Sequence, residues 1–287
     1  MAEVDPHTLH SDIFDRTPLI GAQLCGALEQ SAQEVVTQWD GVDPDVSILI
    51  RTRNNEGRIR SLFDDISAQR FAGEVQVVVV DTESSDGTAQ TAKRLGAEVV
   101  NIAQTDFNYP RALNMGVAVA DHPYVFSIVG HSNLSNDQTL RGISRWHSDA
   151  NLGGIYGAAL PDANASKTEQ ALAFGLVPLV KAPRRITSAT VGVLGANAAV
   201  VNKAAWSELG GFDEKFAAGG EDTELARRML AAGMSVVHEP VLSVHHSHGL
   251  GPINTLRQAL HWVQVARGAH NFDSEQLARR RPDLKLG

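Results

Sequence analysis

The sequence predicts an α/β fold in which helices flank a mostly parallel central sheet. In the first half of the chain, segments with strand and helix patterns alternate, which is typical of parallel strands joined by right-handed crossovers. The β-branched run Val75–Val80 suits a strand buried on both faces. Polar turns follow Ile50, Val80 and Val129, at the carboxyl ends of strands where such sheets bind ligands.

The first half of the chain holds the clearest elements. Pro18 suits the first position of a helix, which we expect to run to Trp39 before Gly41–Pro44 breaks the chain. In chain order we then expect a strand at Val46–Ile50, a helix ending near Gln69, a strand at Val75–Val80, a helix ending at Leu95, a strand at Glu98–Ile102, a helix at Pro110–Ala120 and a strand at Tyr124–Val129.

The second half is less regular, and its basic segment Lys181–Thr190 predicts only a connector. In chain order we expect a strand at Leu152–Leu160, a loop at Pro161–Lys167, a helix or lid at Thr168–Val180, a strand at Gly195–Val201, helices at Lys203–Leu209 and Asp222–Ala232, strands at Ser235–His238 and Leu242–His246, and a terminal helix at Asn254–His270.

Composition excludes several classes of protein. The chain has 287 residues, of which 43% are apolar and 20% charged, as in ordinary globular proteins. The formal charge is −8 and the compact basic clusters are small, so we expect no nucleic-acid partner. Cys25 is alone, no apolar stretch approaches the roughly 18 residues of a membrane helix, and Met1–Asp5 is unlike a signal peptide. We therefore expect a cytoplasmic protein without a membrane span.

Polar side chains follow the first two strands. Thr52, Arg53 and Glu56 come after the first strand, and Asp81 ends the second. A carboxylate at this edge can accept hydrogen bonds from a base or a sugar, and we expect Asp81 to contact a ligand. For Ser84–Thr88 the simpler interpretation, a turn that caps the next helix, is favoured.

A second group lies on the expected helix Pro110–Ala120. Arg111 and Asn114 are one turn apart and share a face. Beside a nucleotide cleft, Arg111 would be a natural phosphate partner. Taken alone, the segment would equally suit a solvated surface arginine.

Histidines form a third group. His131 follows the strand Tyr124–Val129 directly, and His245, His246 and His248 lie close together near residue 250. Alternate residues of a strand share a face, so His246 and His248 can point the same way. Imidazoles favour Mn or Zn over Mg. A polar strand end without a metal is the alternative.

Two acidic residues, Glu221 and Asp222, open the expected helix that ends at Ala232. The helix dipole should favour the anions there and hold the pKa of each carboxylate low. The pair is either a general base placed by a rigid helix start or a simple helix cap.

These motifs, in this order, resemble the family 2 inverting glycosyltransferases of the GT-A (Rossmann-like) fold over about residues 46–248. The resemblance rests on the segments Val46–Glu56, Val77–Thr88, Arg111–Gly116, Gly210–Glu214 and Glu221–Asp222. It implies an N-terminal arm and helix (1–44), a glycosyltransferase domain (45–250) with a nucleotide half (45–133) and an acceptor half (134–250), and a C-terminal helix and tail (251–287).

The resemblance also implies a UDP-sugar donor and a divalent metal, Mn or Mg. Asp222 matches the carboxylate that acts as general base, with Glu221 beside it, and metal and Arg111 would stabilise the leaving diphosphate. The donor-side residues implied are Thr52, Arg53, Glu56, Asp81, Arg111, Asn114 and Gly130.

This sequence departs from the family pattern at three places. Arg51 stands where proline is frequent, and Arg53 stands where an aromatic side chain often stacks on the base. The Asp-x-Asp metal motif is replaced by Gly130-His131. We expect His131 to take the place of the last aspartate with His246 as its partner and His248 as the further candidate, so the metal could be optional.

The expected reaction is transfer of a hexose or N-acetylhexosamine to a hydroxyl or amine of a soluble, small-molecule or carrier-tethered acceptor. The alternatives are a binding module for nucleotide sugars, a nucleotidyltransferase and a histidine-metal hydrolase. The first strand lacks the Gly-rich, Lys-containing loop of a nucleotidyltransferase. The apolar faces of the two terminal helices would suit a homodimer.

Overall fold

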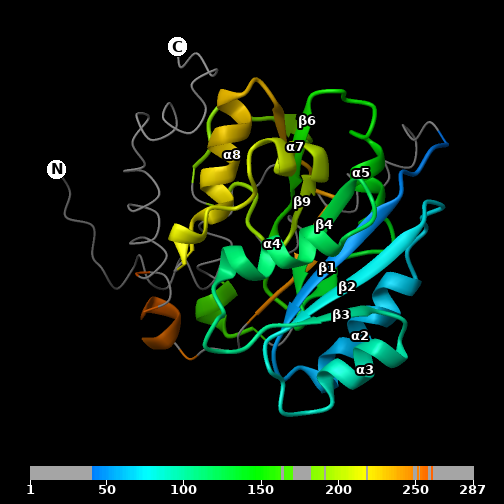
Figure 1. Ribbon diagram of the computed structural model, residues 1–287, viewed down its shortest axis with the longest axis vertical. Helices are drawn as coiled ribbons and strands as arrows, with labels where there is room; N and C mark the ends of the chain where they lie inside the picture. Colours follow the sequence, from blue (N-terminus) through cyan, green and yellow to red (C-terminus); the bar gives the residue numbers. More distant parts are fainter. Residues whose placement is uncertain are drawn as a thin grey trace, which may run out of the picture.

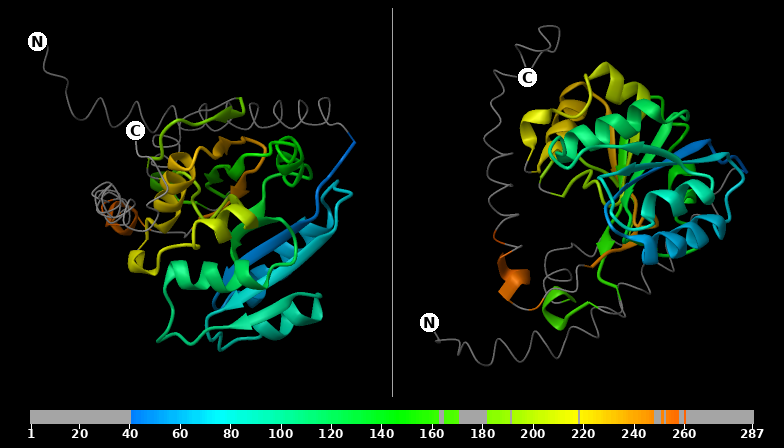
Figure 2. Two further views of the ribbon diagram at one scale, coloured as in Figure 1. Left: turned by 45° about the horizontal axis from the view of Figure 1, so that its top comes forward. Right: turned by 60° about the horizontal axis from the view of Figure 1, so that its bottom comes forward.

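The computed structural model describes residues 41–162, 165–170, 182–190, 192–217, 219–247, 251, 253–257 and 260. These form three layers, with helices on both faces of a central sheet (Figures 1 and 2). The expected helix Pro18–Trp39 and most of Thr168–Val180 lie outside the described residues. The expected domain boundaries stay a prediction.

The central sheet has eight strands in the order β3-β2-β1-β4-β9-β6-β10-β8. Strands β1 to β4 are mutually parallel, and so are β6 and β10. Strand β9 runs antiparallel to β4 and β6, and β8 antiparallel to β10. The mostly parallel α/β sheet is therefore confirmed. The bounds are β1 Val46–Thr52, β2 Val75–Asp81, β3 Glu98–Asn101, β4 Tyr124–Val129, β6 Leu152–Tyr156, β8 Arg184–Arg185, β9 Ala199–Asn202 and β10 Ser235–His238.

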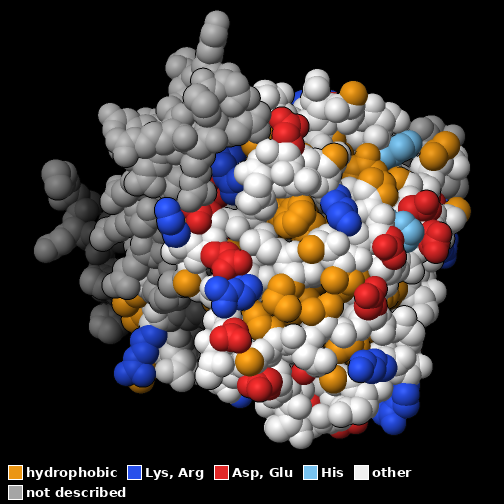
Figure 3. All heavy atoms as spheres, viewed as in Figure 1, with side chains coloured by type: hydrophobic (Ala, Val, Ile, Leu, Met, Phe, Trp, Pro, Cys, Tyr) orange, Lys and Arg blue, Asp and Glu red, His pale blue; other side chains and the backbone are white. Residues whose placement is uncertain are grey.

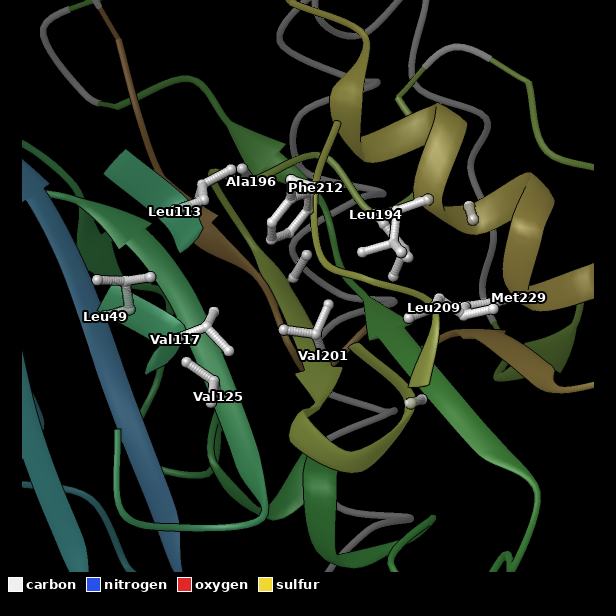
Figure 4. Packing of buried hydrophobic residues seen from close by; sticks show 14 of the residues in the cluster. Leu49, Leu113, Val117, Val125, Leu194, Ala196, Val201, Leu209, Phe212 and Met229 are labelled. Atoms are coloured by element: carbon white, nitrogen blue, oxygen red, sulfur yellow. The ribbon is translucent and has the colours of Figure 1, made fainter. Parts of the chain in front are cut away.

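The helices divide between the two faces of the sheet. Helices α2, α3 and α5 pack on one face, and α4, α7 and α8 on the other. In β1 the side chains alternate: Ile48 and Ile50 join the core beneath α2, while Leu49 packs beneath α4 (Figure 4). The bounds are α2 Glu56–Ser67, α3 Thr88–Arg94, α4 Tyr109–Val119, α5 Arg141–Ser144, α7 Lys203–Glu208, α8 Glu221–Ala231 and a short 3-10 turn at Glu214–Phe216.

A second sheet, in the order β5-β11-β7, consists of three two-residue strands. The bounds are β5 Asn133–Leu134, β7 Ala159–Leu160 and β11 Val244–His245. The expectation of one strand at Leu152–Leu160 was wrong, because β6 and β7 belong to different sheets. The chain leaves the central sheet at Gly157, where any Cβ would collide with the carbonyl of Leu242.

Two further expectations need correction. The connector Lys181–Thr190 contains an edge strand, β8, which no sequence pattern predicted. The expected strand Gly195–Val201 is a loop as far as Ala198 and a strand only from Ala199. This loop approaches the start of α8, and it becomes part of the site described below.

The surface is electrostatically mixed. On the face in Figure 3, acidic and basic side chains of the described residues are interspersed, without a continuous basic area. In the described part of the chain, no helix has the length and apolar character needed to cross a membrane.

Candidate active site

The carboxyl ends of β1, β2 and β4 form one edge of the sheet, called the carboxyl edge below. Here the Gly130 N–H donates to the Arg51 carbonyl at 2.9 Å, which continues the pairing of β4 with β1. A Cβ at Gly130 would overlap the hydroxyl of Thr52. Glycine therefore allows the two strand ends to meet, and His131 follows immediately.

His131 and His246 lie side by side at this edge. Their Nε2 atoms are 2.9 Å apart and their ring centroids 4.7 Å apart. His246 is placed by its backbone N–H, which donates to the Leu160 carbonyl at 2.7 Å and extends the pairing of β11 with β7. Arg58 donates to the His131 carbonyl at 3.2 Å. The structure therefore brings the two histidines together, and their expected role as metal ligands stays a prediction.

The histidine pair fits a shared metal ion. Two imidazole nitrogens bound to one metal at about 2.0–2.1 Å and nearly at right angles lie about 3 Å apart. Elsewhere along this edge, His245 directs Nδ1 to the Pro161 carbonyl at 3.3 Å, and His248 lies outside the described residues. The described residues contain no group of three or more His, Cys, Asp or Glu that could hold a metal.

Glu221 and Asp222 open α8, as expected. Glu221 is buried, and its Oε2 has no hydrogen-bond partner among the residues that the structure describes. Burial, and then repulsion by Asp222, raises the pKa of Glu221 to about 7. Asp222 is partly exposed, and burial also raises its pKa. The expectation that the helix dipole holds both values low was wrong, because loss of hydration outweighs the dipole.

The pair is also not a helix cap. The residue before α8 is Gly220, with φ of 96°, and no side chain caps the helix. Asp222 instead accepts hydrogen bonds from the backbone N–H groups of Thr223 and Ala196. The second bond ties Asp222 to the loop before β9.

Arg51 completes this cluster, although its place in the sequence indicated only a departure from the family pattern. Its side chain is buried, and Nη2 approaches the Ala196 carbonyl at 3.4 Å. Its guanidinium lies 5.4 Å from the ring centroid of Tyr109. Burial lowers the pKa of Arg51, whereas attraction to Glu221 opposes that change. The available signal was a lone charge in a strand whose seven residues are all buried.

The strand-end residues on the donor side lie together but already have protein partners. Asp81 accepts hydrogen bonds from the N–H and hydroxyl of Ser84, at 2.9 and 2.5 Å. Thr52 is buried beside Gly130, and Arg53 donates to Gln104 at 2.7 Å. Their expected contacts with a nucleoside stay predictions.

Glu56 faces the start of α3. Its carboxylate accepts from the Gly87 N–H at 3.1 Å, and the Glu56 N–H donates to Asp86 at 3.1 Å. Asp86 also accepts from the Thr88 N–H at 3.0 Å within the expected turn Ser84–Thr88. The capping part of that expectation was wrong, because the residue before α3 is Gly87 and no side chain of the described residues caps the helix. The bonds of Glu56 and Asp86 join the starts of α2 and α3, and a nucleoside contact of Glu56 stays a prediction.

Arg111 and Asn114 are brought to different partners. Arg111 forms an ion pair with Glu214 at 2.9 Å, and both side chains are partly exposed. Asn114 donates to the Phe212 carbonyl and accepts from the Phe212 N–H, both at 2.9 Å, and accepts from Trp206 at 3.2 Å. Asn114 therefore anchors the loop before α8, whereas a phosphate contact of Arg111 stays a prediction.

The same loop is fixed from α8. Arg228 pairs with Glu224 through bonds of 2.6 and 2.5 Å, and donates to the carbonyls of Leu209 and Gly211. Gly210 and Gly211 have φ of 81° and 77°, which glycine adopts without strain. The Gly-Gly turn and this buried ion pair hold the start of α8 against the sheet.

A family model described as "Glycosyl transferase family 2" matches residues 47–200. This chain belongs to glycosyl transferase family 2. Membership supports the glycosyltransferase interpretation over the nucleotidyltransferase and hydrolase alternatives. Two curated relatives from Salmonella are O-antigen chain rhamnosyltransferases. WbaN from Salmonella anatum is 26% identical over 62% of this chain and 58% of its own length, and RfbN from Salmonella typhimurium is 24% identical over 72% and 68%.

Solved structures confirm the GT-A fold of this family 2 chain. The mannosyltransferase PcManGT from Pyrobaculum calidifontis, in complex with GDP-Man and Mn2+, has a TM-score of 0.60 at 19% identity, and covers 91% of this chain and 77% of its own. TarS from S. aureus in complex with UDP has a TM-score of 0.53 at 16% identity, with 85% and 75% covered.

Proposed function

We propose that this glycosyltransferase moves a hexosyl group from a nucleoside diphosphate sugar to an acceptor hydroxyl, with inversion and with Asp222 as general base. The observation that carries the proposal is the position of Asp222. It is partly exposed at the carboxyl edge, its pKa is raised, and the contact chain Asp222–Ala196–Arg51–Gly130 leads to the histidine pair.

Asp222 would take the proton of the acceptor hydroxyl. The hydroxyl oxygen forms a bond to the anomeric carbon as the bond from that carbon to the diphosphate oxygen breaks. Attack from the opposite side inverts the configuration, and the nucleoside diphosphate leaves with the electron pair. A carboxylate whose pKa is raised by burial is a stronger base than an exposed aspartate, which suits this role.

His131 and His246 would hold a divalent metal beside the leaving group. When bound, that metal supplies positive charge to the diphosphate. Two imidazoles carry less negative charge than an Asp-x-Asp motif, so Mn should bind better than Mg. Arg111 would add a second positive charge after releasing Glu214.

For the sugar, the relatives support a hexose or a 6-deoxyhexose. Two of them are named rhamnosyltransferases, and the structural neighbours are shown with GDP-Man and with UDP. We propose rhamnose as the first sugar to test and a saccharide, free or carrier-tethered, as the acceptor. UDP-hexose and UDP-N-acetylhexosamine donors form the second arm of the test.

The test is release of nucleoside diphosphate from a panel of dTDP-, GDP- and UDP-sugars, each with Mn or with EDTA. The proposal predicts release from one donor class, and loss of release by about 10²–10⁴-fold in Asp222→Asn. Donor affinity, measured by calorimetry, should be unchanged in that variant. Wild-type turnover by Asp222→Asn would refute the role of Asp222. Donor binding without any turnover would favour a binding module.

A further inference from the structure

Arg51 and Glu221 are buried groups of opposite charge, and each has a polar atom without a partner. Arg51 Nε and Glu221 Oε2 are both inaccessible and unbonded among the described residues. Arg51 is 9% exposed and Glu221 is 4% exposed. Burying such atoms is unfavourable unless another interaction compensates, and the attraction between the two side chains supplies one.

Three elements surround the side chain of Arg51, and one of them carries the acidic pair. From α4, Tyr109 presents its ring at 5.4 Å from the guanidinium carbon. From the loop before β9, the Ala196 carbonyl lies 3.4 Å from Nη2. From α8, Glu221 and Asp222 are the charged groups that attract Arg51. Arg51 is thus the cation that faces two adjacent carboxylates.

We propose that Arg51 is a positioning residue that keeps the Glu221–Asp222 pair singly ionised, with the negative charge on Asp222 and the proton on Glu221. This inference rests on the proposed function, because it concerns the base of that reaction. Two adjacent carboxylates with little hydration do not readily ionise together, and one nearby cation supports one anion.

Solvent exposure and hydrogen bonding favour the proton on Glu221. The Glu221 side chain is the less exposed to solvent of the two. Asp222 is partly exposed and accepts two backbone N–H bonds, from Thr223 and Ala196, that stabilise its ionised form. Arg51 also holds the Ala196 carbonyl, so it steadies the residue whose N–H reaches Asp222. Arg51 therefore acts on Asp222 both through its positive charge and through its contact with Ala196.

The first experiment compares the pH profiles of kcat for wild type, Arg51→Lys and Arg51→Met. The proposal predicts that Arg51→Met moves the acidic limb of kcat upward by about one pH unit or more, because the pair then protonates more readily. Arg51→Lys should keep the wild-type limb, and KM for the donor should change little in either variant. Arg70→Met, which removes an exposed arginine paired with Asp137, is the matched control.

An unshifted limb in Arg51→Met, or a loss of kcat that is equal at every pH, would overturn the proposal and leave Arg51 as a packing residue. Absence of turnover in the wild type with every donor would instead count against the proposed function. In that case the ionisation of the pair is read from stability, which needs no activity.

The second experiment measures thermal unfolding against pH. Without Arg51 the folded-state pKa values of the pair rise further, so Arg51→Met should lose stability more steeply than wild type as the pH rises from 5 to 8. Adding Glu221→Gln to Arg51→Met should remove most of that extra slope. If Arg51→Met alone fails to fold, the double variant should fold. Equal destabilisation of the single and double variants at every pH would overturn the proposal.

Discussion

The Nε2 atoms of His131 and His246 lie 2.9 Å apart, although 115 positions separate them in the sequence. The small sheet β5-β11-β7 brings them together, since β5 begins just after His131 and pairs antiparallel with β11, which ends just before His246. As metal ligands, the two residues would supply imidazoles where the usual motif supplies carboxylates. Both the affinity for a metal and the choice of metal should then differ from those of an Asp-x-Asp site.

Removing either histidine should weaken the metal-dependent part of donor binding. We expect His131→Ala and His246→Ala each to lower Mn-dependent affinity for a nucleoside diphosphate about tenfold or more. Calorimetry of UDP and GDP, with Mn and with EDTA, measures this. His245→Ala is the control, because His245 contacts the Pro161 carbonyl instead. Equal affinity with Mn and EDTA in the wild type would mean that the pair binds no metal.

Glu221 should make the folded state less stable as the pH rises. Burial raises its pKa to about 7 from an ordinary value near 4.5, so between these values the folded state binds more protons than the unfolded state. The free energy of unfolding should fall across this interval. In Glu221→Gln the decrease should be smaller, as measured by denaturation at pH 5 and pH 8. The same decrease in both proteins would contradict a raised pKa.

His238 should make the folded state less stable as the pH falls, which is the reverse of the effect of Glu221. It is buried on β10 against Tyr156, and burial lowers its pKa to about 4. Between pH 6.5 and 4 the unfolded state binds the extra proton, so stability is lost as the pH falls. His238→Phe should reduce this loss of stability at acidic pH. His147→Phe, in the turn that follows α5, is the control. If the melting temperature falls equally from pH 7 to pH 4.5 in wild type and His238→Phe, the lowered pKa of His238 is refuted.

Asn114 should contribute stability rather than donor affinity. Asn114→Ala removes its bonds to Phe212 and Trp206 and leaves buried polar groups unpaired, which costs about 1–3 kcal/mol of unfolding free energy. Urea denaturation measures the loss. Arg111→Ala should show the reverse pattern, with weaker donor binding and little change in stability. A large loss of donor affinity in a stable Asn114→Ala protein would instead support the nucleotide contact expected from the sequence.

Sequence patterns sufficed for the parallel half of the sheet because each strand there carries its own apolar run and ends in a polar turn. They also singled out His131, His246, Glu221 and Asp222, whose roles stay predictions. Sequence patterns failed where tertiary contacts determine the bounds of a strand or the pKa of a side chain. The split of β6 from β7 depends on Gly157 meeting a distant carbonyl, and the raised pKa values of the acidic pair depend on burial that residue order does not reveal.

The role of Arg51 also depends on tertiary contacts that sequence patterns do not predict. Its position next to Thr52 suggested only a departure from the family pattern. Its significance emerges when the loop at Ala196 and the start of α8 arrive beside it. A charged residue inside a fully buried strand is nevertheless a signal that sequence reading can use, because such a charge needs a partner in space.

Displacement at the anomeric carbon, with Asp222 as base, determines the configuration of the product. Proton NMR of the first product, formed from a donor of known anomeric configuration, measures this. The product should be the opposite anomer from the donor, and Asp222→Asn should form no product under the same conditions. A product that retains the donor's configuration, or one formed at the wild-type rate without Asp222, would contradict this mechanism.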